Sequence, residues 1–179
     1  MRFSEARSII QMHAGVEDGP RMATGLVASL RPYDGLDDGI LEELMLAIAA
    51  VADHLGTGRD VDRGLIHALW SMCRTARLWG ADESGMLVRN RLISPDDRRK
   101  LETWIDVIES TTLDLLWGQG LPFAIHRYAD AVAEARLPAP GACSASLFLP
   151  ALRCDDADVR MAAAKALGRM GGAARDAVP

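Results

Sequence analysis

The clearest regularity in the sequence is a run of apolar residues spaced three and four positions apart between Asp37 and Leu55. This spacing places them on one face of an α-helix, which is typical of a helix packed against a core. Asp37 is suited to cap the start of the helix, and Gly56 to end it. The face that we expect to be buried consists of Ile40, Leu41, Leu44, Ile48, Val51 and Leu55.

A second segment with helical spacing runs from Asp60 to Trp79 and stops at Gly80. The connection to the first helix, Gly56-Thr57-Gly58, is short, so we expect the two helices to be antiparallel neighbours. The apolar side of this second helix consists of Val61, Leu65, Leu69, Met72, Cys73, Ala76 and Trp79.

A third helix is predicted from Ser94 to about Trp117. Ser94 is a favoured capping residue, and Pro95 follows at the first helical position, where a missing amide proton has no consequence. Weaker patterns predict helices over residues 4–13, 20–30, 122–136, 144–153 and 158–170. The apolar side of the third helix consists of Leu101, Trp104, Ile105, Ile108, Thr112, Leu115 and Leu116.

No segment alternates apolar and polar residues over the length of a strand, so the sequence predicts an all-α fold of stacked antiparallel helical hairpins. Two forms remain open, a HEAT-like α-solenoid and an irregular helical bundle. Residues 137–143 contain two prolines and a glycine and mark a linker. We expect residues 1–136 to form a helical bundle or degenerate helical repeats. Residues 144–179 are too few to fold alone and should pack on it.

The C-terminal segment has the features of a known helical repeat. Leu149-Pro150-Ala151-Leu152 is followed by the acidic turn Asp155-Asp156, then by Val159-Arg160 and by Ala166-Leu167-Gly168. Residues from about 147 to 179 therefore resemble a HEAT-like repeat of the short bacterial kind.

The resemblance implies which side chains face the core and which form the turn. Leu149 and Leu152 would face inward from the first helix of the repeat, and Arg160 would contact Asp155, Asp156 or Asp158. From the second helix the inward residues would be Val159, Ala163, Ala166, Leu167 and Met170. The chain would then be the start of a longer array, or its last helix would dock on another surface.

Composition describes an ordinary globular chain. It has 179 residues, 49% of them apolar, and 20 basic against 25 acidic residues give a net charge of −5. Three cysteines without metal-site spacing favour a reduced compartment. The N-terminus does not resemble a secretory signal, and the longest apolar stretch, residues 44–52, is shorter than the ~20 residues of a membrane helix. We therefore expect a cytoplasmic protein without membrane association.

Candidate catalytic groups are few. None of the four histidines has a second histidine three or four residues away, so zinc-hydrolase spacing is absent. Glu102, Asp106 and Glu109 share a helix side, which we interpret as a solvated face. His126 and Asp130 are four residues apart but lack a nucleophile motif, and we expect Cys73 and Cys143 to be buried. The sequence therefore predicts a protein that is not an enzyme, with no cofactor and no metal site.

Charge is unevenly distributed along the chain. Residues 34–62 carry eight acidic residues and one basic residue, a net charge of −7, whereas residues 74–100 carry a net charge of +3. Such asymmetry can steer a partner of complementary charge. The acidic helix start therefore predicts a binding site for a protein partner at Asp37, Asp38, Glu42 and Glu43.

The sequence thus favours a non-enzymatic protein-binding module. The resemblance implies a HEAT-like scaffold, of which an immunity or inhibitor-type protein would be one form. One alternative, also drawn from the resemblance, is a lyase-like or accessory protein that handles a small cofactor. Another is nucleic-acid binding through residues 89–100, although a sequence pI near 5.3 and interleaved acids argue against it.

Overall fold

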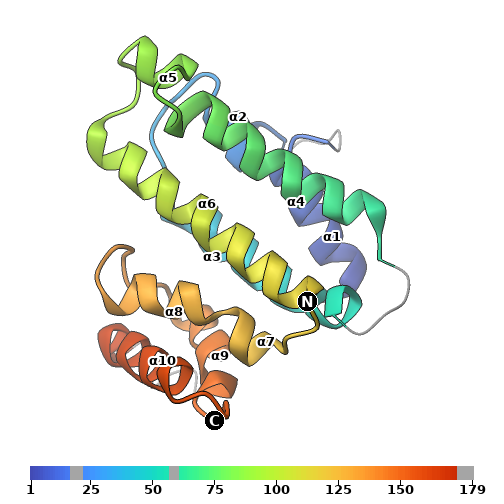
Figure 1. Cartoon of the computed structure of the whole chain (residues 1–179). Helices are drawn as coiled ribbons and strands as arrows, with labels where there is room; N and C mark the ends of the chain where they lie inside the picture. The colour runs from blue at the N-terminus through green and yellow to red at the C-terminus, as the bar shows by residue number, and fades with distance from the viewer. Residues whose placement is uncertain (17–21, 57–60, 173–179) are drawn as a thin grey trace.

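The computed structural model describes residues 1–16, 22–56 and 61–172 (Figure 1). Within these ranges the only β-pairing is a single bridge between Leu30 and Tyr33, so the all-α prediction is confirmed. The helices are α1 (Phe3–His13), α2 (Leu26–Ser29), α3 (Asp38–Gly56), α4 (Arg63–Ala76), α5 (Met86–Arg89), α6 (Pro95–Leu116), α7 (Leu121–Ala124), α8 (His126–Ala133), α9 (Ala142–Ala151) and α10 (Ala157–Met170). A 3₁₀ turn covers Met22–Thr24 and a π-helical turn covers Arg77–Ala81.

Four long helices form the N-terminal bundle, in which α1 contacts α3, α3 contacts α6, α6 contacts α4 and α4 contacts α1. The helices α3 and α4 therefore lie on a diagonal, and the prediction that they are direct neighbours is wrong. The reason is the wide apolar surface of α3, whose predicted face is fully buried together with Met45, Ala47 and Ala52. Such a surface packs against α1 on one side and α6 on the other. The predicted connection at residues 57–58 lies outside the described residues.

The starts of the long helices follow local capping chemistry. The Ser94 hydroxyl accepts a hydrogen bond from the Asp97 amide at 3.0 Å, as predicted. Helix α4 begins at Arg63 rather than near Asp60, because the Asp62 carboxylate accepts hydrogen bonds from the Gly64 and Leu65 amides. The end of α4 also differs from the prediction, because the α-helix ends at Ala76 rather than Trp79 and the chain continues through the π-helical turn. A Cβ atom at Gly80 in this turn would lie 2.5 Å from Leu101 Cδ2, so glycine permits the close approach of α6.

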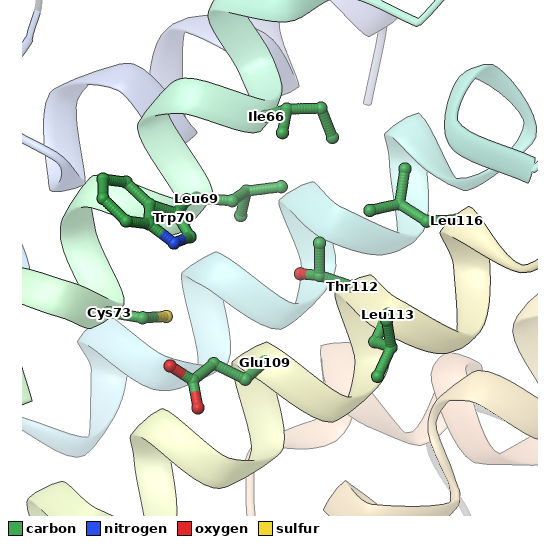
Figure 2. A pocket seen from close by; sticks show the side chains of 8 residues that line it. All are labelled: Ile66, Leu69, Trp70, Cys73, Glu109, Thr112, Leu113 and Leu116. Atoms are coloured by element: carbon green, nitrogen blue, oxygen red, sulfur yellow. The ribbon is translucent and has the colours of Figure 1, made fainter.

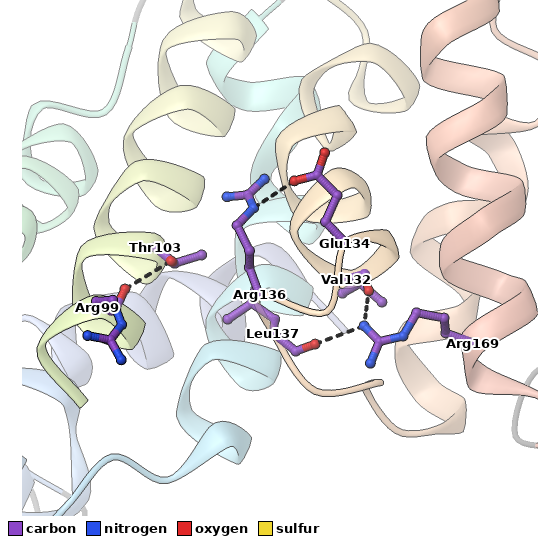
Figure 3. Close-up of polar contacts among 7 residues, drawn as sticks. All are labelled: Arg99, Thr103, Val132, Glu134, Arg136, Leu137 and Arg169. Atoms are coloured by element: carbon purple, nitrogen blue, oxygen red, sulfur yellow. Dashed lines mark hydrogen bonds and ion pairs between the residues drawn. The ribbon is translucent and has the colours of Figure 1, made fainter. Parts of the chain in front are cut away.

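The C-terminal helices α8, α9 and α10 pack together, with α8 against α6 and α9 against α3. The predicted linker joins α8 to α9, which begins at Ala142. The Arg169 guanidinium fixes this connection by donating hydrogen bonds to the carbonyl oxygens of Val132 and Leu137 (Figure 3). Tyr128 of α8 packs against Phe148 of α9, with 5.2 Å between the centres of their rings.

The hairpin formed by α9 and α10 agrees in part with the predicted repeat. All the inward residues predicted for α10 are buried except Leu167, which is half-buried. In α9 the apolar core residues are instead Ala145, Leu147, Phe148 and Ala151, while Leu149 is half-buried. Leu152 is exposed because α9 ends at Ala151 and Leu152 lies in the turn that follows.

The turn of this hairpin is held by hydrogen bonds to the backbone. The Arg160 guanidinium donates to the carbonyl oxygens of Cys154 and Asp155 at 2.7 and 2.8 Å. Arg160 thus reaches the predicted turn, but through carbonyl groups rather than carboxylates. The Asp156 carboxylate instead caps α10 by accepting hydrogen bonds from the first amides of that helix. The tail that resembles the start of another repeat, residues 173–179, lies outside the described residues.

Candidate functional site

The four acids predicted to bind a partner lie at the start of α3, and two of them hold exposed positions there. The Asp37 carboxylate caps α3 by accepting a hydrogen bond from the Gly39 amide at 3.0 Å. Asp38 forms an ion pair with Lys100 of α6 at 2.7 Å, and the same ammonium donates to the Leu36 carbonyl oxygen. Both carboxylates therefore stabilise the start of α3.

The other two acids, Glu42 and Glu43, contact elements far away in sequence. The Glu42 carboxylate accepts hydrogen bonds from the Gly141 amide at 3.2 Å and from the Ser144 hydroxyl at 2.8 Å, so it caps α9 from α3. Glu43 contacts His13 of α1 at 3.0 Å. All four acids thus have a role within the fold, and their use in binding a partner stays a prediction.

His13 is a buried side chain at the end of α1, with 1% of its surface exposed. Its Nδ1 atom accepts a hydrogen bond from the Leu26 amide at 3.2 Å, and its Nε2–H group donates to Glu43. An imidazole whose Nδ1 is an acceptor carries its proton on Nε2. His13 therefore joins α1, α2 and α3, which is a structural role. No local pattern in the sequence predicts this role, because its partners are 13 and 30 residues away along the chain.

The other candidate catalytic groups do not form a site. Glu102, Asp106 and Glu109 are exposed, as predicted. The His126 ring contacts the Phe123 carbonyl oxygen, and its nearest described carboxylate is Asp114 of α6 at 3.7 Å, rather than Asp130. Within the described ranges, no group of three His, Cys, Asp or Glu side chains is arranged to hold a metal ion.

The cysteines differ from one another in exposure. Cys73 is buried as predicted, and burial together with the nearby Glu109 carboxylate raises the pKa of its thiol to about 12. A thiol with so high a pKa is a poor nucleophile at neutral pH. Cys143 is exposed, so the prediction that it is buried is wrong. It occupies the first turn of α9, on the side of that helix away from the core.

An apolar groove lies between α4 and α6 (Figure 2). Its volume is about 280 Å³. Two of the polar side chains that line it are already bonded, because the Thr112 hydroxyl donates to the Ile108 carbonyl oxygen and Glu109 forms an ion pair with Arg77. The groove is lined by Ile66, Leu69, Trp70 and Cys73 of α4 and by Glu109, Thr112, Leu113 and Leu116 of α6.

A second hollow adjoins the groove at the beginning of α4 and shares Ile66 and Trp70 with it. The Trp70 side chain is 60% exposed, and Trp117 at the end of α6 is 74% exposed. Leu113 and Trp117 are four residues apart and so share one side of α6. Together these residues make an exposed apolar surface, which we call the α4/α6 surface. It consists of Val61, Ile66, Trp70, Leu113, Leu116 and Trp117.

The α4 side of this surface is basic. Arg63, His67 and Arg74 are exposed on the same side of α4 as Trp70, and the Arg74 guanidinium lies 5.3 Å from the centre of the Trp70 ring. Arg77 continues this row and pairs with Glu109 across the end of the groove. Among the described residues no carboxylate pairs with Arg63 or Arg74. The row therefore presents a net positive charge beside the groove, although the whole chain is acidic.

The basic stretch at residues 89–100, considered for nucleic-acid binding, is largely paired with acids. Arg98 contacts Glu102, Arg99 contacts Asp96, and Lys100 contacts Asp38. These pairs reduce the positive charge that the stretch presents to a phosphate backbone.

Sequence reasoning missed the α4/α6 surface, although one signal was present. Trp70 lies outside the periodic apolar face of its helix, and so large an apolar residue on a polar face indicates contact with something beyond that core. Leu116, by contrast, was assigned to the buried side of its helix, and this assignment is wrong because Leu116 is exposed at the edge of the groove.

None of the described helices is both long and apolar enough to cross a membrane. No protein-family model, curated protein or solved structure matches this chain. Conclusions about its function therefore depend on the geometry of the molecule itself.

Proposed function

We propose that this protein is a non-enzymatic protein-binding module whose partner covers the α4/α6 surface. The observation that carries the proposal is the exposure of Trp70, Leu113 and Leu116 around one apolar groove. The exposed Trp117 follows Leu113 by four residues and extends this surface toward the end of α6. Single exposed apolar residues are common, but a contiguous group around a hollow is characteristic of an interface. Tryptophan is also the residue type most enriched among the side chains that dominate binding energy.

The groove fits protein side chains better than it fits a cofactor. Small-molecule pockets place several unsatisfied polar groups around the ligand, whereas the Thr112 hydroxyl and the Glu109 carboxylate of the groove are already bonded. These features support a protein partner over the cofactor-handling alternative. The paired cations of residues 96–100 likewise support it over nucleic-acid binding.

The HEAT-like scaffold is the finer form of this proposal. Its support is the C-terminal hairpin, in which two helices are joined by an acidic turn and α10 buries small residues such as Ala162, Ala163 and Ala166. An immunity or inhibitor-type role would be a still narrower form, in which the partner is a toxin or an enzyme. Both forms require a protein partner, so the same first experiment applies to them.

The experiment compares co-purification of the parent chain and two double variants from native extract. Trp70→Ala with Trp117→Ala removes both exposed indoles of the α4/α6 surface. Leu92→Ala with Met161→Ala is the matched control. Both residues are also exposed, but Leu92 follows α5 and Met161 lies on α10. Circular dichroism checks that each variant is folded.

We expect a stoichiometric protein to accompany the parent and the control and to be lost from the tryptophan variant. Retention by the tryptophan variant, or equal loss from the control, would contradict the proposal. So would a co-purifying chromophore or nucleic acid in place of a protein, which would favour one of the two alternatives.

A further inference from the structure

The two hollows beside Trp70 are offset along α4. The groove takes Leu69 and Cys73 from α4, whereas the second hollow takes Arg63 and His67, and Ile66 and Trp70 belong to both. The α4 residues of the second hollow precede those of the groove by three positions, which corresponds to roughly 4.5 Å along a helix. The Trp70 ring thus forms a ridge between two apolar hollows that are about one helical turn apart.

This offset matches the spacing of side chains on an α-helix. Residues three apart on one helix face are also separated by roughly 4.5 Å along its axis. A partner helix lying over Trp70 would place one large apolar side chain in each hollow. Packing a helix into the depression between two others is a common way to recognise amphipathic segments.

The charges beside the hollows define the flank of such a helix. Arg63 lines the second hollow, and Arg74 lies over the outer side of Trp70. They are eleven residues apart on α4, which is about three turns or roughly 16 Å. No carboxylate in the described part of the chain pairs with either, so both guanidinium groups can pair with acidic side chains of an occupant.

We propose that the partner presents an amphipathic α-helix to the α4/α6 surface, with two large apolar side chains one turn apart on either side of Trp70 and acidic residues facing Arg63 and Arg74. This inference rests on the proposed function and specifies the partner. It does not require that the partner be known, because a synthetic helix can carry the same features.

The test uses three designed peptides of about 16 residues, a length of roughly four helical turns. The first is an alanine-based helix with two leucines three residues apart and glutamates along one flank. The second has lysines in place of the glutamates, and the third has serines in place of the leucines. Binding to the full chain is measured by the anisotropy of a dye on the peptide, at low and at physiological salt.

We expect the glutamate peptide to bind at least about fivefold more tightly than the lysine peptide, the effect of two exposed charge pairs. The difference should shrink at the higher salt concentration, since exposed charges are screened. The serine peptide should not bind measurably. In the variant with Arg63→Glu and Arg74→Glu the preference between the first two peptides should reverse. In the control with Arg89→Glu and Arg153→Glu, two exposed residues elsewhere, it should persist.

Several results would overturn the inference. If neither leucine peptide binds, the occupant is not such a helix, while the proposed function stands as long as the native partner still depends on Trp70 and Trp117. Equal affinity for the glutamate and lysine peptides would contradict the inference that acidic residues of the partner helix face Arg63 and Arg74. Binding that survives Trp70→Ala would place the helix on another surface. Self-association of the chain that Trp70→Ala abolishes would identify a second copy as the occupant.

Discussion

Replacing Glu42 by alanine tests how the C-terminal helices are attached to the bundle. The Glu42 carboxylate reaches from α3 to the start of α9, where it accepts hydrogen bonds from the Gly141 amide and the Ser144 hydroxyl. Ser144 is fully buried, whereas Gly141 is exposed. In the alanine variant water can satisfy the amide, but the Ser144 hydroxyl loses the acceptor that Glu42 supplies.

The size of the stability loss follows from the burial of Ser144 and the exposure of Gly141. A buried donor without an acceptor costs about 1–3 kcal/mol, and loss of a helix cap costs about 1 kcal/mol. We therefore expect Glu42→Ala to lower the free energy of unfolding by about 2–4 kcal/mol. In a domain of this size each kcal/mol shifts Tm by about 2–4 °C, so the fall in Tm should be about 4–16 °C.

A double-mutant cycle isolates the contact. Ser144→Ala removes the stranded hydroxyl, so the double variant should be less destabilised than the two single variants together, with a coupling of about 1–2 kcal/mol. Asp106→Ala is the matched control, since Asp106 is an exposed helical acid, and it should change stability by less than about 0.5 kcal/mol. Urea denaturation followed by circular dichroism measures all four variants.

Additivity of Glu42→Ala and Ser144→Ala would refute the reasoning, because independent sites add to within about 0.3–0.5 kcal/mol. An effect of Glu42→Ala no larger than that of Asp106→Ala would refute it as well. Either result would mean that the carboxylate does not cap α9. Charge reversal at Glu42 should disturb the fold as well, because a lysine side chain cannot accept the hydrogen bonds of the Gly141 amide and the Ser144 hydroxyl.

Two further predictions concern titratable groups. The hydrogen bond from the Leu65 amide, aided by the charge of Arg7, lowers the pKa of Asp62 below its ordinary value of 3.8. The Asp62 carboxylate therefore contributes its full stability above pH 3.8, and this contribution is lost as the pH falls through the lower pKa of the folded state. Asp62→Asn keeps a capping oxygen but not the charge, so its stability should vary less than the parent's between about pH 4 and 2, and identical pH profiles in acid denaturation would contradict this. At about pH 8 a thiol reagent should modify Cys143 at least about 100-fold faster than Cys73, because Cys73 is buried and its thiol stays protonated. Equal rates, measured in single-cysteine variants, would show that α4 opens readily.

The sequence by itself determined the long helices and most of their buried faces. The periodic residues of α3 are all in the core, and the Ser94 cap starts α6 where it was predicted. These features depend on side chains three or four residues apart, whose relative positions a helix fixes locally. For the same reason the inward side of α10 was largely predictable from its spacing of small residues.

The tertiary structure alone decided how the helices are arranged and where the exposed surface lies. Nothing local places α3 diagonal to α4, because both faces of α3 are apolar and the choice of neighbour depends on how four helices fill one core. Glu42 reads as an exposed acid in sequence, yet it caps a helix that begins about 100 residues later. The groove likewise exists only because α4 and α6 pack side by side with Trp70 and Leu113 at its edges, a juxtaposition of residues more than 40 positions apart that no local pattern specifies.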